Sequence, residues 1–74
     1  MSIRKAFGQV LRETRKKRGV SQERLALDSG MDRAYLSRLE RGITQPTLET
    51  IFRLSKVLGI SPSVIVRRVQ QKLR

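Results

Sequence analysis

The segment MDRAYLSRLERG, at positions 31–42, carries side chains that suit binding better than catalysis. Leu36 and Leu39 have the spacing of the buried side of a short helix, and Arg33, Ser37 and Arg38 fall outside that side. The planar guanidinium group of arginine fits the edge of guanine and the oxygens of phosphate. A helix that only covers a core has little need of arginines in its first two turns. The pattern therefore indicates a helix side that contacts a partner outside the chain.

Catalytic and metal-binding chemistry has little support in the composition. The chain has no cysteine and no histidine, so it lacks thiolate ligands, the commonest metal ligand and the usual general base near neutral pH. The six acidic residues are scattered and show no paired spacing. We therefore expect no enzyme, no metal site and no cofactor.

The charge balance favours a polyanionic partner. Seventeen Lys and Arg residues stand against six acids, which gives a net charge of +11 and a pI near 11.7. Such a chain attracts nucleic acid or an anionic membrane surface. No apolar run approaches the length of a membrane span, and the basic start MSIRKAFG lacks the apolar region of a secretory signal. We expect a cytoplasmic protein without a membrane partner.

Five amphipathic helices are predicted to position the binding face, and no segment alternates as a strand does. The predicted N-caps are Ser21, Asp32, Thr47 and Ser61, and the predicted helix stops are Gly19, Gly30, Gly42 and Gly59. The apolar sides are expected to be Ile3, Phe7, Val10, Leu11 and Thr14 in the first helix and Leu48, Ile51, Leu54 and Leu58 in the fourth. We expect one compact all-α domain over residues 1–74.

The second and third predicted helices are separated only by the short turn DSGMD, which is the arrangement of a helix-turn-helix motif over about residues 21–41. Ala26 is small enough for the two helices to approach closely, and Gly30 can make the turn. In such motifs the N-terminal end of the second helix enters the major groove of DNA. The residues that would face base edges are Arg33, Ala34, Ser37 and Arg38.

A family resemblance follows from the order of these elements. The stretch FGQVLRETRKKRGVSQERLALDSGMDRAYLSRLERG closely resembles the helix-turn-helix domain of the lambda-repressor and Cro type, often called the Xre family. PTLETIFRLSKVLGISPSVI is similar to the fourth helix of that family and the start of its fifth, so the resemblance runs from about Ile3 to Val66. It implies a compact five-helix, lambda-repressor-like fold. DRAYLSRLERG looks most like the controller proteins of restriction-modification systems.

The resemblance implies roles for individual positions. The base-reading positions of the family correspond to Arg33, Ala34, Ser37 and Arg38. Gln22 matches a glutamine that contacts a phosphate, and Arg15 and Glu40 match an ion pair between the first and third helices. The controller proteins commonly have threonine where this chain has Ala34, so their target sequence does not carry over.

Several of these positions keep more than one role. Tyr35, in the third predicted helix (the recognition helix of the motif), either packs under that helix or contacts a phosphate. Ser37 can bond a base, a phosphate or its own helix, and Ala34 touches a thymine methyl or does nothing. Lys17 and Arg18 are either solvated charges or contributors to sequence-independent attraction of phosphate.

The fifth helix, about residues 61–72, carries more apolar residues than are needed to seal a small core. The surplus predicts a homodimer interface formed by Val64, Val66, Val69 and Leu73. Dimers of this motif class read inverted repeats with half-sites one helical turn, about 34 Å, apart. The alternative is that the end of the helix past Arg67 frays in solution.

We therefore expect a sequence-specific double-stranded DNA-binding transcriptional regulator, a repressor or a controller, that binds an inverted-repeat operator as a homodimer. The alternatives are an antitoxin of a toxin–antitoxin pair and a protein- or RNA-binding adaptor with the same fold. RNA readers usually stack bases on aromatic side chains. The chain has only Phe7, Tyr35 and Phe52, and two of the three are expected to be buried.

Overall fold

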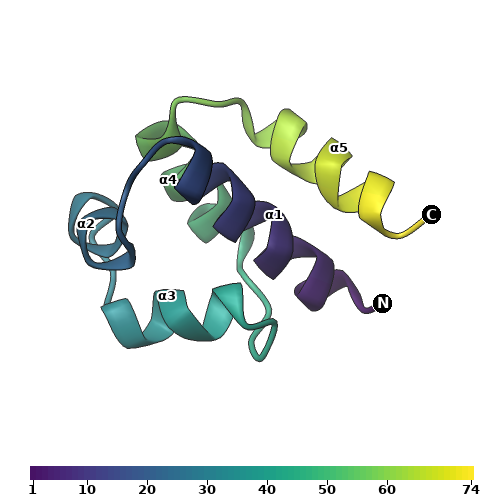
Figure 1. Ribbon diagram of the computed structural model, residues 1–74, viewed down its shortest axis with the longest axis horizontal. Coiled ribbons are helices and arrows are strands. Elements are labelled where there is room, and N and C mark those ends of the chain that lie inside the picture. Colours follow the sequence, from purple (N-terminus) through teal and green to yellow (C-terminus); the bar gives the residue numbers. More distant parts are fainter.

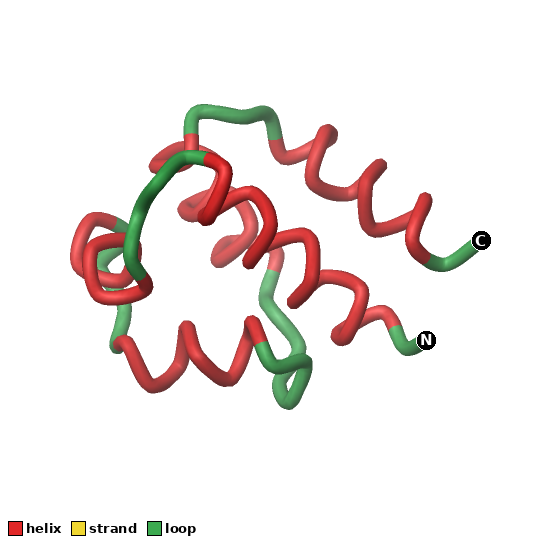
Figure 2. Tube along the Cα trace, in the orientation of Figure 1, coloured by secondary structure: helices red, strands yellow, loops and turns green.

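The computed structural model describes residues 1–74 and consists of five helices with no strand (Figure 1; Figure 2). The helices are α1 (Ile3–Lys17), α2 (Gln22–Asp28), α3 (Arg33–Glu40), α4 (Leu48–Leu58) and α5 (Pro62–Lys72). The all-α class and the five helices predicted from the sequence are confirmed. In the ribbon view α1 crosses the middle of the molecule, with α3 on one side of it and α5 on the other (Figure 1).

The helix termini follow local signals in the sequence. Each of the four predicted N-caps accepts a hydrogen bond through its side-chain oxygen from a backbone N–H two or three residues further on; these caps are Ser21, Asp32, Thr47 and Ser61. Pro62 begins α5, where a missing N–H leaves no hydrogen bond unmade. Gly30 lies in the turn between α2 and α3 with a φ of 67°, a left-handed conformation that glycine adopts at little cost.

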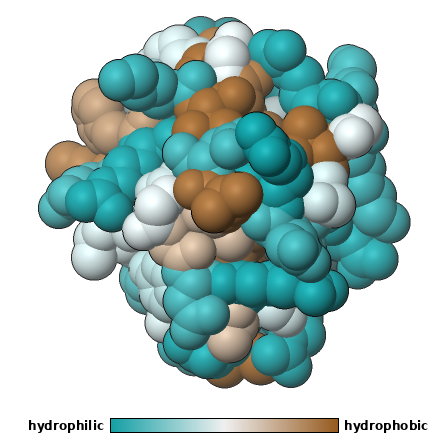
Figure 3. Space-filling view, turned by 90° about the vertical axis from the view of Figure 1, so that its left-hand side faces the viewer, coloured by the Kyte–Doolittle hydropathy of each residue, from teal (hydrophilic) through white to brown (hydrophobic).

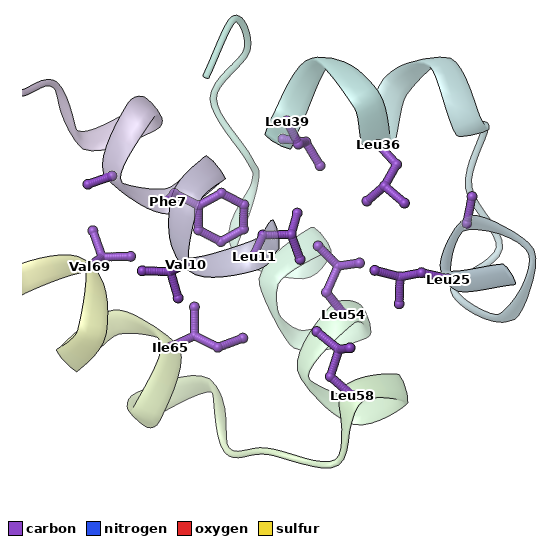
Figure 4. Packing of buried hydrophobic residues seen from close by; sticks show 12 residues of the cluster. Phe7, Val10, Leu11, Leu25, Leu36, Leu39, Leu54, Leu58, Ile65 and Val69 are labelled. Carbon is purple, nitrogen blue, oxygen red and sulfur yellow. The ribbon is translucent and has the colours of Figure 1, made fainter. Parts of the chain in front are cut away.

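One core of 12 buried apolar residues draws on all five helices (Figure 4). Its members are Ala6, Phe7, Val10, Leu11, Leu25, Ala26, Leu36, Leu39, Leu54, Leu58, Ile65 and Val69. Helices as short as the 7-residue α2 and the 8-residue α3 are unstable in isolation. Packing of α3 against α1 and α2 therefore determines where α3, the predicted recognition helix, lies.

The approach of α1 to α3 is close because Gly8 has no side chain. A Cβ built at Gly8 would lie 2.6 Å from the carbonyl oxygens of both Leu39 and Glu40. A Cβ atom does not approach a carbonyl oxygen that closely, because the two make no hydrogen bond. The last turn of α3 is thus held directly against the backbone of α1.

Three predictions of buried residues are wrong. Leu48 is 70% exposed and Ile3 is 57% exposed, and of the three aromatic residues only Phe7 is fully buried, since Phe52 is 55% exposed. Burial along α4 rises from Leu48 through a half-buried Ile51 to a fully buried Leu54. The first turn of α4 therefore projects past the edge of the core, although the apolar spacing continues through it. Ile3 lies in the first turn of α1 and projects in the same way.

The assignment of Val69 to a dimer interface is also corrected. Val69 is 9% exposed and belongs to the core of its own chain, together with Ile65 four residues earlier. Val66 and Leu73 are 53% and 40% exposed, and Val64 is half-buried. The apolar stripe of α5 divides into one side that faces α1 and another that faces solvent.

Candidate nucleic-acid interface

The helix-turn-helix geometry is produced by α2, the turn at Gly30 and α3. Ala26 is 2% exposed at the contact between the two helices, and its carbonyl accepts a hydrogen bond of 2.9 Å from the N–H of Met31. Leu36 and Leu39 point from α3 into the core, toward the labelled leucines of α1, α2 and α4 (Figure 4). The opposite side of α3 consequently faces solvent along one edge of the molecule (Figure 1).

Two arginines on the solvent side of α3 are free to reach a ligand. Arg33 and Arg38 are exposed, and the only ion pair of Arg33 is a contact of 3.8 Å to Glu23, an exposed residue. Exposed pairs of this kind contribute little and are easily exchanged for another anion. The guanidinium carbon of Arg38 lies 6.0 Å from the ring centroid of Tyr35, at the outer limit of a cation–π contact. Neither guanidinium group is held by the protein.

The small residues between the arginines leave room for a base edge. Ala34 is exposed and Ser37 is half-buried. The hydroxyl of Ser37 makes no hydrogen bond within the chain, so it is not bonded to its own helix and keeps its capacity for a base or a phosphate.

Arg15 and Glu40 form a nearly buried ion pair. The Nε of Arg15 donates to Oε2 of Glu40 at 2.6 Å, and Nη2 donates to Oε1 at 3.0 Å. The two side chains are 11% and 3% exposed. A third hydrogen bond runs from Nη1 of Arg15 to the carbonyl of Val20 at 2.9 Å, so the guanidinium group joins α1, the loop before α2 and the end of α3. Such a pair orients α3 whether or not it adds net stability.

Gln22 joins this pair, which the sequence did not predict. Its Nε2 donates to Oε1 of Glu40 at 2.9 Å. An amide group has two N–H donors, so one remains for a ligand. Gln22 is half-buried at the first residue of α2. No spacing in the sequence places it beside Glu40, because the contact depends on how α2 packs against α3.

Tyr35 is half-buried and packs against the core. Its hydroxyl lies 3.5 Å from Oγ1 of Thr50, a long contact that places it near the start of α4. The packing role expected for Tyr35 is therefore present, and the hydroxyl is held only weakly.

Lys17 and Arg18 do not lie with the other site residues. Together with Thr14, Ile60 and Arg68 they line a depression at the end of α1, and Nη2 of Arg18 donates to the carbonyl of Gly59 at 3.2 Å. Lys17 follows Thr14 by three residues, so both point toward α5 rather than α3. The structure gives no support to phosphate contacts by these two residues beside the recognition helix.

Other kinds of site are not apparent in the structure. No group of three or more acidic, histidine or cysteine side chains could hold a metal ion. None of the helices has the length and apolar character needed to cross a lipid bilayer.

The same arrangement is found in known proteins. The profile of a family described as Helix-turn-helix matches residues 11–65 of the chain. The chain belongs to this family. The Control protein C.BamHI of Bacillus amyloliquefaciens is 42% identical over 62 residues, which cover 82% of this chain and 76% of that protein. The crystal structure of the restriction-modification controller protein C.AhdI from Aeromonas hydrophila is 44% identical with a TM-score of 0.81, over 84% of this chain and 94% of that one.

A third similar structure includes nucleic acid. The master regulator for biofilm formation SinR, solved in complex with DNA, is 33% identical with a TM-score of 0.77, over 81% of this chain and 97% of that one. Family membership confirms the predicted lambda-repressor-like fold and makes the chain a DNA-binding transcriptional regulator. Regulators of this kind are not enzymes. The matches do not favour an antitoxin or a protein- or RNA-binding adaptor.

Proposed function

We propose that the chain is a sequence-specific transcriptional regulator, a repressor or a controller, that reads the major groove of double-stranded DNA with α3. The observation that carries this proposal is the contrast between the two sides of α3. One side is fixed by Leu36, Leu39 and the paired Glu40, and the other presents Arg33 and Arg38 without a firm partner. A rigid support with free donors is what base reading requires, because the donors must meet base edges in one geometry.

Individual contacts are proposed from the same geometry. Arg33 and Arg38 would donate to base edges, each in the bidentate manner that favours guanine. Ser37 would bond a base or a phosphate and Ala34 would lie against a base, while Gln22 would use its second amide hydrogen on a phosphate. Contacts to phosphate determine the register of the protein on the duplex but carry no sequence information. The hydroxyl of Tyr35 is a further candidate for a phosphate.

We also propose that the chain acts as a homodimer on an inverted-repeat operator. A groove between α1, the loop before α4, and α5 is lined mainly by apolar residues, including Ile3, Pro46, Ile51 and Val66. Ile3 and Val66 are 57% and 53% exposed. On the side of the molecule that carries α2, apolar residues form separate patches among hydrophilic ones (Figure 3). The groove therefore offers the better surface for a second copy, and contiguous exposed apolar area marks such sites.

The two surfaces assign DNA binding and dimerisation to different helices. We propose that residues 1–74 act as one DNA-binding unit in the cytoplasm, with the helix-turn-helix at about 21–41 and dimerisation through α5 and its neighbours. Val66 and Leu73 would supply the contact on α5, whereas Val64 lies about 160° from Val66 around the helix and does not line the groove. The relatives C.BamHI and C.AhdI are controller proteins by name, which supports a regulator of this type.

Selection of bound sequences from random duplexes tests the proposal. We expect enrichment of an inverted repeat, followed by a tighter dissociation constant for the selected duplex than for a shuffled one of the same composition. Specific binding in this class usually exceeds non-specific binding by a factor of about a thousand or more. Equal affinity for the two duplexes at the same salt concentration would contradict sequence-specific reading.

A further inference from the structure

The positive charge of the chain is divided unevenly between its two halves. Residues 1–19 and 60–74, which contain α1 and α5, hold 11 of the 17 Lys and Arg residues and one of the six acids. Residues 20–59, which contain the helix-turn-helix and α4, hold the remaining six basic and five acidic residues. The half with the recognition helix is thus close to neutral by itself. Nearly all of the net charge of +11 belongs to the other half.

The cations of α1 and α5 lie on two neighbouring helices. The two helices lie side by side, and α1 separates α5 from α3 (Figure 1; Figure 2). Nζ of Lys72 lies 2.9 Å from Oε2 of Glu13, and Nη1 of Arg68 lies 3.4 Å from Oγ1 of Thr14, so side chains of α5 reach across to α1. We define the outer basic surface as Arg12, Lys16, Lys17, Arg67, Arg68 and Lys72.

Most of the outer basic surface has no anionic partner. Arg12, Lys16 and Arg67 are exposed and make no salt bridge or side-chain hydrogen bond, and Glu13 is the only acid on α1 or α5. On the other half, by contrast, Arg24 and Arg53 each pair with an acid one turn away. Arg12 and Lys16 are one helical turn apart on α1, a spacing at which like charges repel one another. This repulsion between cations persists in the folded chain unless a polyanion binds and neutralises it.

We propose that the outer basic surface is a second binding surface for duplex DNA, so that the protein can hold one DNA segment on α3 and another on α1 and α5. The part of this surface on α5, formed by Arg67, Arg68 and Lys72, lies across α1 from α3 and would lie away from a duplex seated on α3. Duplex DNA carries one negative charge per about 1.7 Å of its axis, which makes it among the densest anionic partners available to such a surface. Lys17 and the adjacent Arg18, which do not lie beside α3, would contact phosphates of this second duplex.

Other polyanions fit the outer basic surface less well. Single strands are held by aromatic side chains on which bases stack. None lies here, because Phe7 is buried and Tyr35 and Phe52 belong to α3 and α4. Helices that lie on membranes alternate cations with large exposed apolar residues. The outward positions of α1 between Lys5 and Lys16 are polar, with Gln9 between the cations. An acidic protein is the remaining alternative partner, and the experiment below distinguishes it from duplex DNA.

Energy transfer between two duplexes tests the proposal. The probes are two duplexes of one random sequence, each about two helical turns long, labelled with a donor or an acceptor and mixed with the full chain. The first variant carries Arg12→Gln, Lys16→Gln and Arg67→Gln. The control carries Arg24→Gln, Arg53→Gln and Lys56→Gln, which removes the same charge from exposed residues of the other half. Circular dichroism checks that both variants are folded.

We expect the unmutated protein and the control to bring the two duplexes together. The first variant should bind the second duplex at least tenfold more weakly, and its salt slope should decrease by about 0.9 for each phosphate that it no longer neutralises. Its affinity for a single duplex should match that of the control. The random probe makes this result independent of whether α3 reads a specific sequence.

Four results would overturn the proposal. The first is no energy transfer with the unmutated protein, and the second is an equal loss of transfer in the control. The third is loss of transfer in the double variant Arg33→Ala with Arg38→Ala but not in the first variant. The fourth is tighter binding of labelled polyglutamate than of duplex DNA at the same salt concentration. The third result would mean that a dimer bridges duplexes through its two recognition helices. The fourth would assign the surface to an acidic protein.

Discussion

Arg15 and Glu40 form a two-pronged ion pair of 2.6 and 3.0 Å whose carboxylate also accepts a hydrogen bond from Gln22. The pair belongs to the scaffold, and Gln22 belongs to the proposed DNA contact. One carboxylate therefore connects the stability of the fold to the position of the side chain that we propose to contact a phosphate. Loss of Glu40 should affect both properties together.

Glu40→Ala is expected to lower the free energy of unfolding by about 3 kcal/mol, because it leaves Arg15 partly buried without its partner. It should also weaken binding to every duplex, since Gln22 loses the group that orients it. Urea denaturation and fluorescence anisotropy with labelled DNA measure the two effects. The control is Glu49→Ala, which removes an exposed pair with Arg53 and an acid in the first turn of α4 and should cost about 1 kcal/mol or less. A variant at Glu40 with both properties unchanged would show that the pair does not orient α3.

Arg33→Ala and Arg38→Ala should each reduce discrimination between the selected duplex and single-base variants of it. The expected loss is about 1–3 kcal/mol at particular base pairs, as for a bidentate contact to guanine. Gln22→Ala should instead reduce the affinity for selected and shuffled duplexes by similar factors, because a phosphate contact carries no sequence information. Competition binding against a set of point-mutated duplexes distinguishes the two patterns.

Arg24→Ala is the control for the loss of one positive charge. Arg24 is an exposed residue of α2 that pairs with Asp28. This variant should lower the affinity for all duplexes slightly and alter no base preference. If Arg33→Ala and Arg38→Ala behave in the same way, then base reading by these two arginines is wrong.

Local features of the fold could be predicted from the sequence, and features that depend on packing could not. The caps at Ser21 and Asp32 depend on residues within one turn, so their side-chain oxygens identify them. The exposure of Leu48 depends on where α4 meets the core, which no local spacing reveals. Val69 shares a stripe with Val66, and only the position of α1 decides which of them is buried.

The candidate site divides in the same way. The side of α3 that carries Arg33 and Arg38 follows from the helical period and the buried leucines. The bond between Gln22 and Glu40 depends on the packing of three helices, and so does the separation of Lys17 from α3. The helical period identifies the two sides of one helix, but it does not tell which neighbouring helix each side meets.

Gly8→Ala should destabilise the fold although alanine is the better helix former by about 1 kcal/mol. The added methyl group would meet the carbonyl oxygens of Leu39 and Glu40 at 2.6 Å, so α1 and α3 must move apart. Overpacking of this kind costs about 1–3 kcal/mol and would disturb the Arg15–Glu40 pair next to it. We expect a lower melting temperature and weaker DNA binding. Gln9→Ala, at an exposed position of α1, is the control and should melt no lower than the unmutated protein.

Val66→Asp should produce a folded monomer that binds DNA poorly. Val66 is 53% exposed and lines the apolar groove between α1, the loop before α4, and α5, so a carboxylate there is solvated in the monomer but buried without a partner in a dimer. Val69→Asp should instead unfold the chain, because Val69 is part of the core. Sedimentation and circular dichroism separate the two outcomes.

The matched control for Val66→Asp is Leu27→Asp, which places the same charge at a residue of α2 that is 69% exposed. This variant should sediment as the unmutated protein does. Two linked recognition helices bind an inverted repeat far more tightly than one, because the second contact becomes intramolecular. Loss of the dimer should therefore lower the affinity for the full operator more than that for a half-site. If the unmutated protein at tens of micromolar sediments as a single species of 8.5 kDa, then the proposed homodimer is wrong.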